Sequence, residues 1–235
     1  MSETRPAASN RSPQEYRARV LFFLLVAVLL LVGLNVVYQA IATLDRLQAV
    51  EAERDGWQRP DDVIEALNLR QGSAVVDLGC GAGYFALKLS RTVGSRGQVI
   101  AIDIRRLPLA FLRVRALFRR RWNIQIVRSE ANDPNLPVGT MDGILIANTY
   151  HELTDRGTIL AKAFRSLRAG GRLVIVDRGP EEQGEAGAGG GHHELPLAIA
   201  ESELLGHGFQ SVQRVDRFID RPPDEPWWLI VARKP

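Results

Sequence analysis

The sequence is poor in the residues that build disulfide frameworks and metal centres. It contains one cysteine, Cys80, and four histidines among 235 residues. A lone cysteine excludes a disulfide within the chain and a cysteine-based zinc site. His192, His193 and Glu194 are adjacent, but no third ligand follows them at a suitable spacing. We therefore expect no metal site.

The chain also lacks the strong positive charge of most nucleic-acid-binding proteins. Its net charge is only +3, and few aromatic residues interleave with the arginines that gather between Arg105 and Arg121. The simplest interpretation is that these arginines form a solvated surface of the protein. The alternative is that they contact the surface of an anionic membrane. We expect no nucleic-acid partner.

One long stretch near the N-terminus has no charged residue at all. Residues 1–19 are polar and predict a disordered tail, whereas residues 20–41 are apolar and uncharged. About 22 residues at about 1.5 Å each span roughly 33 Å, which matches the hydrocarbon thickness of a bilayer. The pattern predicts a single-pass transmembrane helix, followed by a helical stalk over 42–56 and a folded domain over 57–235.

A cleaved signal peptide is the alternative interpretation of this stretch. Arg17 and Arg19 would precede its apolar region, and Ala40-Ile41-Ala42 resembles a small-x-small cleavage site. The apolar run is longer than that of an ordinary signal peptide, which favours an uncleaved anchor. Arginines lie on both sides of the segment, so the charge pattern does not assign the membrane side of the domain.

Seven apolar segments of the domain have the pattern of strands. The expected strands are Ala74–Leu78, Gln98–Asp103, Ile124–Arg128, Asp142–Ala147, Arg172–Asp177, Ser211–Phe218 and Trp227–Ala232. Helical segments alternate with the first five, which predicts a mostly parallel sheet with helices on both faces. The connection between the last two is too short for a crossover, so these two should form an antiparallel pair.

A glycine-rich turn follows the first expected strand and opens a helix. Gly79, Gly81 and Gly83 are spaced G-x-G-x-G, and Tyr84 stands where dinucleotide-binding folds place a third glycine. The spacing disfavours a nicotinamide-binding protein. Asp77, at the end of the strand, would repel a phosphate but suits the amino group of a methionine moiety. Cys80 is interpreted as a small residue of the turn.

Asp103 ends the second expected strand, about 25 residues beyond the glycine turn. A carboxylate in that place can accept hydrogen bonds from both hydroxyls of a ribose. Glycine turn, acidic residue and strand context together indicate a site for a nucleoside with free hydroxyls.

These segments resemble a known family. VVDLGCGAGYFALKLS is similar to the first motif of the class I S-adenosylmethionine-dependent methyltransferases, and IAIDI resembles their ribose-binding strand. The resemblance covers about residues 57–235. RDGWQRPDDVIEAL, NTYHEL and GHGF further resemble a group of small-molecule methyltransferases inferred from sequence. The resemblance implies a Rossmann-like α/β fold and S-adenosyl-L-methionine as cofactor.

The family's pattern also implies roles for individual residues. Gly79, Gly81 and Gly83 should line the methionine and the ribose, while Asp103 should bind the ribose hydroxyls and Ile104 should lie against the adenine. Asn132 or Asp133, after Ala131, stands where the family often holds the adenine amino group. Asn132 occupies the usual acidic position, which leaves that assignment open.

The fourth expected strand brings residues 148–152 to the same edge of the sheet, where ligands of open α/β folds bind. Asn148 is assigned to cofactor binding. His151 is the candidate general base, with a hydrogen-bonded structural histidine as the alternative. Tyr150 is a candidate catalytic residue, either as a substrate gate or as a packing wall. N-T-Y-H in place of N-P-P-Y argues against methylation of DNA adenine or of amides.

The function that follows is a methyltransferase for a small or lipid-soluble acceptor, held near a membrane by the N-terminal helix. A quinone precursor or a lipid headgroup would suit such an enzyme, and the glycine-rich residues 179–191 could form a lid over it. The alternative is a membrane-tethered module that binds S-adenosylmethionine without turnover.

Overall fold

The computed structural model describes residues 13–179, 195–220 and 226–235. Contacts within the chain divide it into two compact units, Met1–Val50 and Glu51–Pro235. The boundary falls inside the first helix, so the last turns of that helix belong to the folded domain.

Helix α1 runs without a break over Pro13–Trp57. Residues 13–19, expected in a disordered tail, are helical instead, because glutamate, arginine and alanine propagate a helix that the apolar stretch already stabilises. The expected stalk is part of the same helix. By length and composition α1 could cross a membrane, with a mean hydropathy of 3.1 in its most apolar window, and a signal sequence would meet the same criterion.

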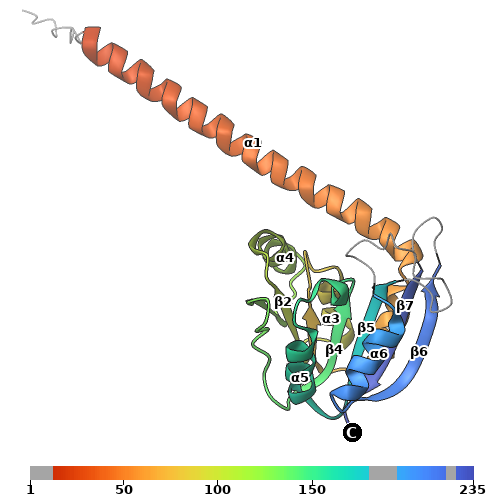
Figure 1. Cartoon of the computed structure of the whole chain (residues 1–235). Coiled ribbons are helices and arrows are strands. Elements are labelled where there is room, and N and C mark those ends of the chain that lie inside the picture. The colour runs from red at the N-terminus through yellow and green to blue at the C-terminus, as the bar shows by residue number, and fades with distance from the viewer. Residues whose placement is uncertain (1–12, 180–194, 221–225) are drawn as a thin grey trace, which may run out of the picture. The chain divides into compact units, whose positions relative to one another are not determined.

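The domain is built on one seven-stranded sheet in the order β3-β2-β1-β4-β5-β7-β6. Strands β2, β4, β5, β7 and β6 of this sheet are labelled in Figure 1. The strands are β1 Ala74–Leu78, β2 Gln98–Asp103, β3 Ile124–Arg128, β4 Met141–Ala147, β5 Leu167–Arg178, β6 Gln210–Ile219 and β7 Trp227–Arg233. The first five are parallel, and β7 lies antiparallel between β5 and β6. The expected fold class and the antiparallel last pair are confirmed.

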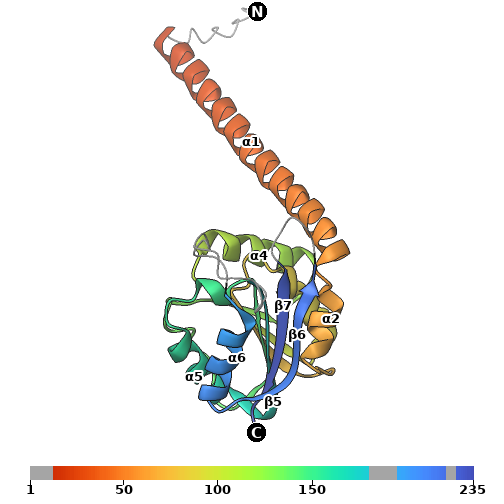
Figure 2. The same cartoon turned by 45° about the vertical axis from the view of Figure 1, so that its right-hand side comes forward.

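Helices cover both faces of the sheet (Figure 2). Helices α2 Pro60–Ala66, α3 Tyr84–Val93 and α4 Arg106–Phe118 share one apolar core with one face, and α5 Arg156–Ser166 and α6 Leu197–Gly206 share a second core with the other. A short 3-10 helix, η1 Tyr150–Glu152, follows β4. Both cores consist largely of aliphatic side chains that alternate along the strands, as burial on two faces requires.

Strand β5 begins five residues earlier than expected, at Leu167 instead of Arg172. Its first part contains Gly170 and Gly171, and its pairing with β4 shifts register between Met141 and Gly143. Glycines in a strand often mark such an irregularity, which is why the alternation of apolar residues failed to show the early start.

Candidate active site

The turn after β1 requires glycine at two of its positions. Gly79 and Gly83 have φ angles of +78° and +90°, in a region that side chains disfavour. A Cβ at Gly79 would lie 2.4 Å from Oγ1 of Thr149, and one at Gly83 would lie 2.2 Å from Cδ1 of Leu112. The turn therefore packs directly against the segment after β4 and against helix α4.

Asp103 joins this turn to the end of β2. Its Oδ2 accepts a hydrogen bond of 2.9 Å from the backbone N–H of Gly81, and its Oδ1 accepts one of 2.8 Å from that of Arg105. The side chain is buried. Nε of Arg105 also donates to Oδ1, at 3.3 Å. Each carboxylate oxygen has two lone pairs, so Oδ2 can still accept a hydrogen bond from a ligand, and a second ligand hydrogen bond would displace the exposed Arg105 side chain.

A cavity of about 210 Å³ opens beside Gly79 and Asp103 at the carboxyl ends of β1, β2 and β4. Its apolar lining comes from Leu78, Ile102, Ile104, Pro134, Leu153 and Ile159. Its polar lining includes Ser129, Glu130, Thr149, Glu152 and Thr154. An apolar cavity with a few polar groups at its rim suits a planar heterocycle attached to a ribose.

The segment after β3 forms one wall of this cavity, but with other side chains than expected. Ser129, Glu130 and Ala131 line it, whereas Asn132 and Asp133 do not. Nζ of Lys162 in α5 lies 2.9 Å from Oδ1 of Asp133, and this contact lowers the pKa of the exposed carboxyl group. The assignment of Asn132 or Asp133 to the adenine therefore stays a prediction, which this placement of the two residues disfavours.

Two buried polar side chains, one on β1 and one just after α1, have an atom without a hydrogen-bond partner in the described part of the chain. Oδ2 of buried Asp77 and Nε2 of buried Gln58 form no hydrogen bond with the described residues. Arg54 donates through Nε to Oε1 of Gln58 at 2.7 Å, and its guanidinium lies 4.0 Å from the ring centre of Tyr84. The last turns of α1 thus bring a cation and an amide to the carboxylate of β1.

Burial raises the pKa of Asp77 to about 7, and the charge of Asp103 adds to the effect, while a hydrogen bond from Ala86 and the charge of Arg54 oppose it. Burial lowers the pKa of Arg54, and the nearby Asp77 raises it. A buried carboxylate without a full set of partners is costly, so this place favours a ligand that brings a positive group.

His151 lies at the ends of β4 and β5, against a buried acidic residue. Its Nδ1 is 2.7 Å from Oδ1 of Asp177, whose Oδ2 accepts a hydrogen bond of 3.0 Å from the backbone N–H of His151. The carboxylate holds the proton of a neutral imidazole on Nδ1, which leaves Nε2 as the basic nitrogen. Nε2 lies 3.8 Å from Oε1 of Glu152, a residue of the cavity wall.

Tyr150 and Cys80 have structural surroundings. The ring of Tyr150 is fully buried in the core beside α6, and its hydroxyl donates a hydrogen bond of 2.6 Å to Glu203. Burial first, then Glu203, raise its pKa. This geometry corrects the catalytic assignment of Tyr150 in favour of the packing wall. Burial also raises the pKa of Cys80, as expected of a residue that only fills the turn.

Asn148 follows β4 in a left-handed conformation, with φ +51°. Its Oδ1 is buried without a hydrogen-bond partner among the described residues, although Asn148 does not line the cavity. Within the same part of the chain, no group of three metal-ligating side chains occurs. His192, His193, Glu194 and residues 180–191 of the expected lid lie outside the described residues.

Three residues of this edge escaped the sequence analysis. Asp177 ends a strand just as Asp103 does, and that position could have identified it. Arg54 lies in the expected stalk and Gln58 just beyond it, within a stretch whose resemblance to methyltransferases assigned neither residue a role. No local signal shows that the last turns of this helix pack against the glycine turn.

A model of the ubiE/COQ5 methyltransferase family matches residues 35–183. The chain belongs to this family. The match includes β1, β2, the glycine turn, and both members of the His151–Asp177 pair. The enzyme class is therefore that of a methyltransferase that uses S-adenosyl-L-methionine, and the carboxylate of Asp77, whose Oδ2 has no partner in the described part of the chain, fits the positive amino group of that cofactor.

Individual members of the family and solved structures agree with this assignment. The ubiquinone/menaquinone biosynthesis C-methyltransferase UbiE of Marinomonas sp. is 29% identical over 72% of this chain and 67% of its own length. UbiE of Pseudomonas putida is 34% identical over 52% of this chain, which spans only 47% of that relative. The crystal structure of a SAM dependent methyltransferase from Aquifex aeolicus aligns with a TM-score of 0.62 and 25% identity, over 75% of this chain and 89% of that one.

Proposed function

We propose that this protein is an S-adenosylmethionine-dependent C-methyltransferase whose acceptor is the ring of a lipid-soluble quinone precursor. The observation that supports it most is the position of the His151–Asp177 pair, at the sheet edge that also carries the cofactor cavity. The UbiE relatives act in ubiquinone and menaquinone biosynthesis by name, and a ring carbon becomes a better nucleophile when a base removes a proton from its hydroxyl group.

The cofactor would be held at both ends by residues of this edge of the sheet. Asp77 would bind the amino group of its methionine moiety, while Arg54 and Gln58 would bind the carboxylate. Asp103 would accept hydrogen bonds from the ribose, and Ile104 would pack against the adenine in the cavity. Asn148, whose side-chain oxygen is unpartnered, is the further candidate near the methionine end.

When bound, S-adenosylmethionine supplies a methyl group that positive sulfur has already activated. The protein therefore contributes mainly alignment, and a base where the acceptor must lose a proton. Nε2 of His151 would take the proton of a ring hydroxyl as the ring carbon bonds to the methyl carbon and the bond from sulfur to that carbon breaks. His151 would return this proton to the oxygen once the methylated carbon releases its own proton to water.

Helix α1 would keep the enzyme at the membrane where such an acceptor resides. Its apolar side chains are exposed along the whole of residues 20–37, except at Val26. Tethering raises the effective concentration of a membrane-resident acceptor, whereas a diffusible polar acceptor would gain nothing from it. Localisation by a single-pass anchor is thus part of the same proposal.

One observation favours the alternative of a tethered module that binds S-adenosylmethionine without turnover. The side chain of His151 is only 1% exposed, and Asp177 is fully buried, as in a purely structural pair. The two functions differ in one respect that can be measured, because only the enzyme produces a methylated compound and S-adenosylhomocysteine.

The test uses the full-length protein in membranes with cofactor that carries a labelled methyl group. Lipid extracts and the pool of soluble metabolites are offered separately, and labelled products are identified by mass spectrometry. We expect label in a ring compound of the lipid extract, and a rate that falls when residues 1–50 are removed. Label only in soluble products, at equal rates with and without these residues, would defeat the proposal; binding without any labelled product would establish the alternative.

A further inference from the structure

Helix α4 is apolar on both of its faces. Leu109, Leu112 and Ala116 are buried against the sheet, as the inner face of a surface helix should be. The opposite face carries Leu107, Val114, Leu117 and Phe118, all exposed. At about 100° per residue, these four side chains project within one arc of about 100°. A surface helix of a soluble domain would have polar residues in that arc.

Trp122 extends this exposed surface beyond the end of the helix. Its side chain is 73% exposed, and that of Phe118 is 78% exposed. We call Leu107, Val114, Leu117, Phe118 and Trp122 the outer stripe. Large aromatic side chains so far out of the core are typical of proteins that contact a partner or a membrane.

Arginines surround the outer stripe. Arg106, Arg113, Arg119 and Arg120 are exposed, Arg121 is half-buried, and none of the five forms an ion pair with a carboxylate in the described part of the chain. Arg115 of the same helix behaves differently. It is buried, and it donates to the carbonyl of Ala82 in the glycine turn and to the carboxylate of Glu51. The outward arginines are therefore available to an external anion.

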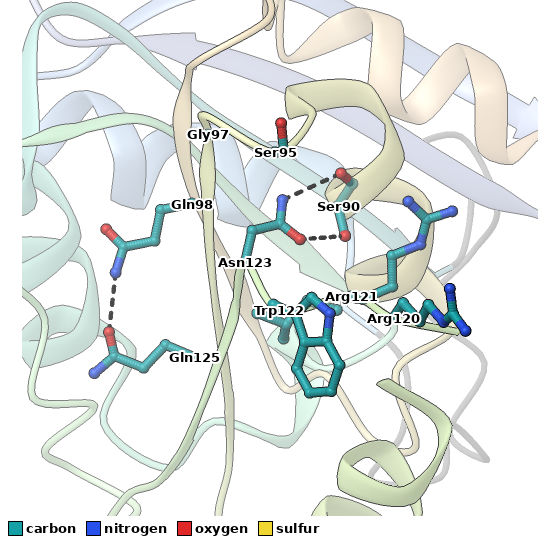
Figure 3. A pocket seen from close by; sticks show the side chains of 10 residues that line it. Ser90, Ser95, Gly97, Gln98, Arg120, Arg121, Trp122, Asn123 and Gln125 are labelled. Atoms are coloured by element: carbon teal, nitrogen blue, oxygen red, sulfur yellow. Dashed lines mark hydrogen bonds between the residues drawn. The ribbon is translucent and has the colours of Figure 1, made fainter. Parts of the chain in front are cut away.

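Arg120, Arg121 and Trp122 also line a surface cavity of about 370 Å³ at the end of α4 (Figure 3). The floor of this cavity is fixed by hydrogen bonds from Asn123 to the backbone of Ser90 and Gly94, at 3.2 and 2.9 Å. Figure 3 shows the side chains of Arg120, Arg121 and Trp122 near the hydrogen bonds between Asn123 and Ser90. The cavity has room for a phosphate group beside the indole ring of Trp122.

We propose that the outer stripe and its arginines form a second membrane contact, which seats the domain on a bilayer of anionic lipids. An apolar face with basic residues along its borders is the composition of helices that lie in the membrane interface. Basic residues near such a surface are each attracted to anionic headgroups. This inference rests on the proposed function only in that it needs the domain to work at a bilayer.

The contact would have a consequence for the active site. Helix α4 begins three residues after Asp103, and Ile104 and Arg105 between them line the cofactor cavity. A domain that rests on α4 would therefore hold one rim of that cavity close to the headgroups. A lipid-soluble acceptor would then have a short path from the bilayer to the cavity.

Fluorescence quenching by lipid provides the test, because Trp122 is far more exposed than the other three tryptophans. Trp227 and Trp228 are buried and Trp57 is half-buried. The full-length protein is reconstituted in vesicles of phosphatidylcholine and phosphatidylglycerol with brominated acyl chains. We expect quenching relative to unbrominated vesicles, and the loss of at least half of it in the Trp122→Phe variant.

A matched control moves the indole to an exposed position elsewhere. Val138 is 74% exposed and lies outside α4. The double variant with Trp122→Phe and Val138→Trp should not regain the quenching. A triple variant with Arg113→Gln, Arg120→Gln and Arg121→Gln should require at least twice the phosphatidylglycerol fraction for half-maximal quenching. Retention of α1 in carbonate-washed membranes is scored in parallel, so that loss of the anchor is not mistaken for loss of this contact.

Two results would overturn the inference. Quenching that is unchanged in the Trp122→Phe variant would show that the outer stripe does not reach the acyl chains. The second result is that Trp122 is protected from aqueous iodide but is not quenched by brominated lipid, while cross-linking in nanodiscs yields dimers. This result would show that a second copy of the chain covers the outer stripe instead.

Discussion

Nδ1 of His151 lies 2.7 Å from Oδ1 of Asp177, although His151 belongs to the short helix η1 after β4 and Asp177 lies near the end of β5. The carboxylate fixes the orientation of the imidazole and holds the ring at the same sheet edge as the cofactor cavity. A buried carboxylate that orients a histidine is the arrangement by which other enzymes prepare a general base.

Replacement of either member of this pair should affect turnover more than binding. We expect His151→Gln to lower the rate of methyl transfer about 100-fold or more, because a positioned general base contributes roughly that much. Asp177→Asn should have a similar effect, and the double variant should be little worse than either single one. Single-turnover kinetics, with calorimetry for cofactor affinity, would check this. Full activity of His151→Gln would exclude His151 as the general base but would not contradict the rest of the proposal.

Asp103→Ala should weaken the binding of S-adenosylmethionine at least tenfold. It removes two charge-assisted hydrogen bonds to the ribose, each worth roughly 1.5–3 kcal/mol, and it also frees the backbone N–H of Gly81 from its partner. Calorimetry on the folded variant measures the effect, and Asp133→Ala serves as the control because Asp133 points to Lys162. An unchanged dissociation constant would exclude Asp103 as the ribose ligand.

The affinity for the cofactor should depend on pH through Asp77. Burial raises the pKa of this carboxyl group to about 7, so the free enzyme holds the proton at pH 6 and must lose it to bind an ammonium group. Affinity should therefore rise roughly three- to tenfold between pH 6 and 7.5, then fall as the amino group of the ligand loses its own proton near pH 8. Asp77→Asn should bind more weakly and with a flat profile. A wild-type profile that is flat over this range would contradict the assignment.

Arg54 should discriminate between S-adenosylmethionine and its decarboxylated analogue. Loss of a charged hydrogen-bonding partner costs about 1.5–3 kcal/mol, so Arg54→Gln should weaken binding of the cofactor about tenfold. The affinity of the Arg54→Gln variant for the analogue should stay close to that of the wild type, because the analogue lacks the carboxylate. Arg91→Gln, exposed on α3, is the control. Equal losses for both ligands would instead indicate that Arg54 acts only by packing on Tyr84.

The N-terminal helix should hold the protein in the membrane. The full chain should stay in the pellet after carbonate washing, whereas a variant that starts at Val50, and so keeps Glu51 as the partner of Arg115, should be released. Mass spectrometry of the mature N-terminus distinguishes an anchor from a signal peptide. A chain that begins at Thr43 would establish cleavage.

Local patterns in the sequence determined a large part of this protein. Short runs of apolar residues located the seven strands, because a strand that is buried on both faces of a sheet is apolar at nearly every position. The glycine turn and Asp103 identified the cofactor edge, because a tight turn beside a strand end needs glycine wherever φ is positive or a neighbour comes close. Gly79 meets both conditions, against Thr149.

Only the tertiary structure decided how residues far apart in the sequence combine. Arg54 comes close enough to Asp77 to influence its pKa, His151 contacts Asp177, and Lys162 contacts Asp133, since each of these pairings depends on how separate elements pack. The same is true of the arginines of α4, which look alike in sequence. Packing buries Arg115 against Glu51 and leaves Arg113 on the surface, because helical rotation, not residue type, sets which side faces the core.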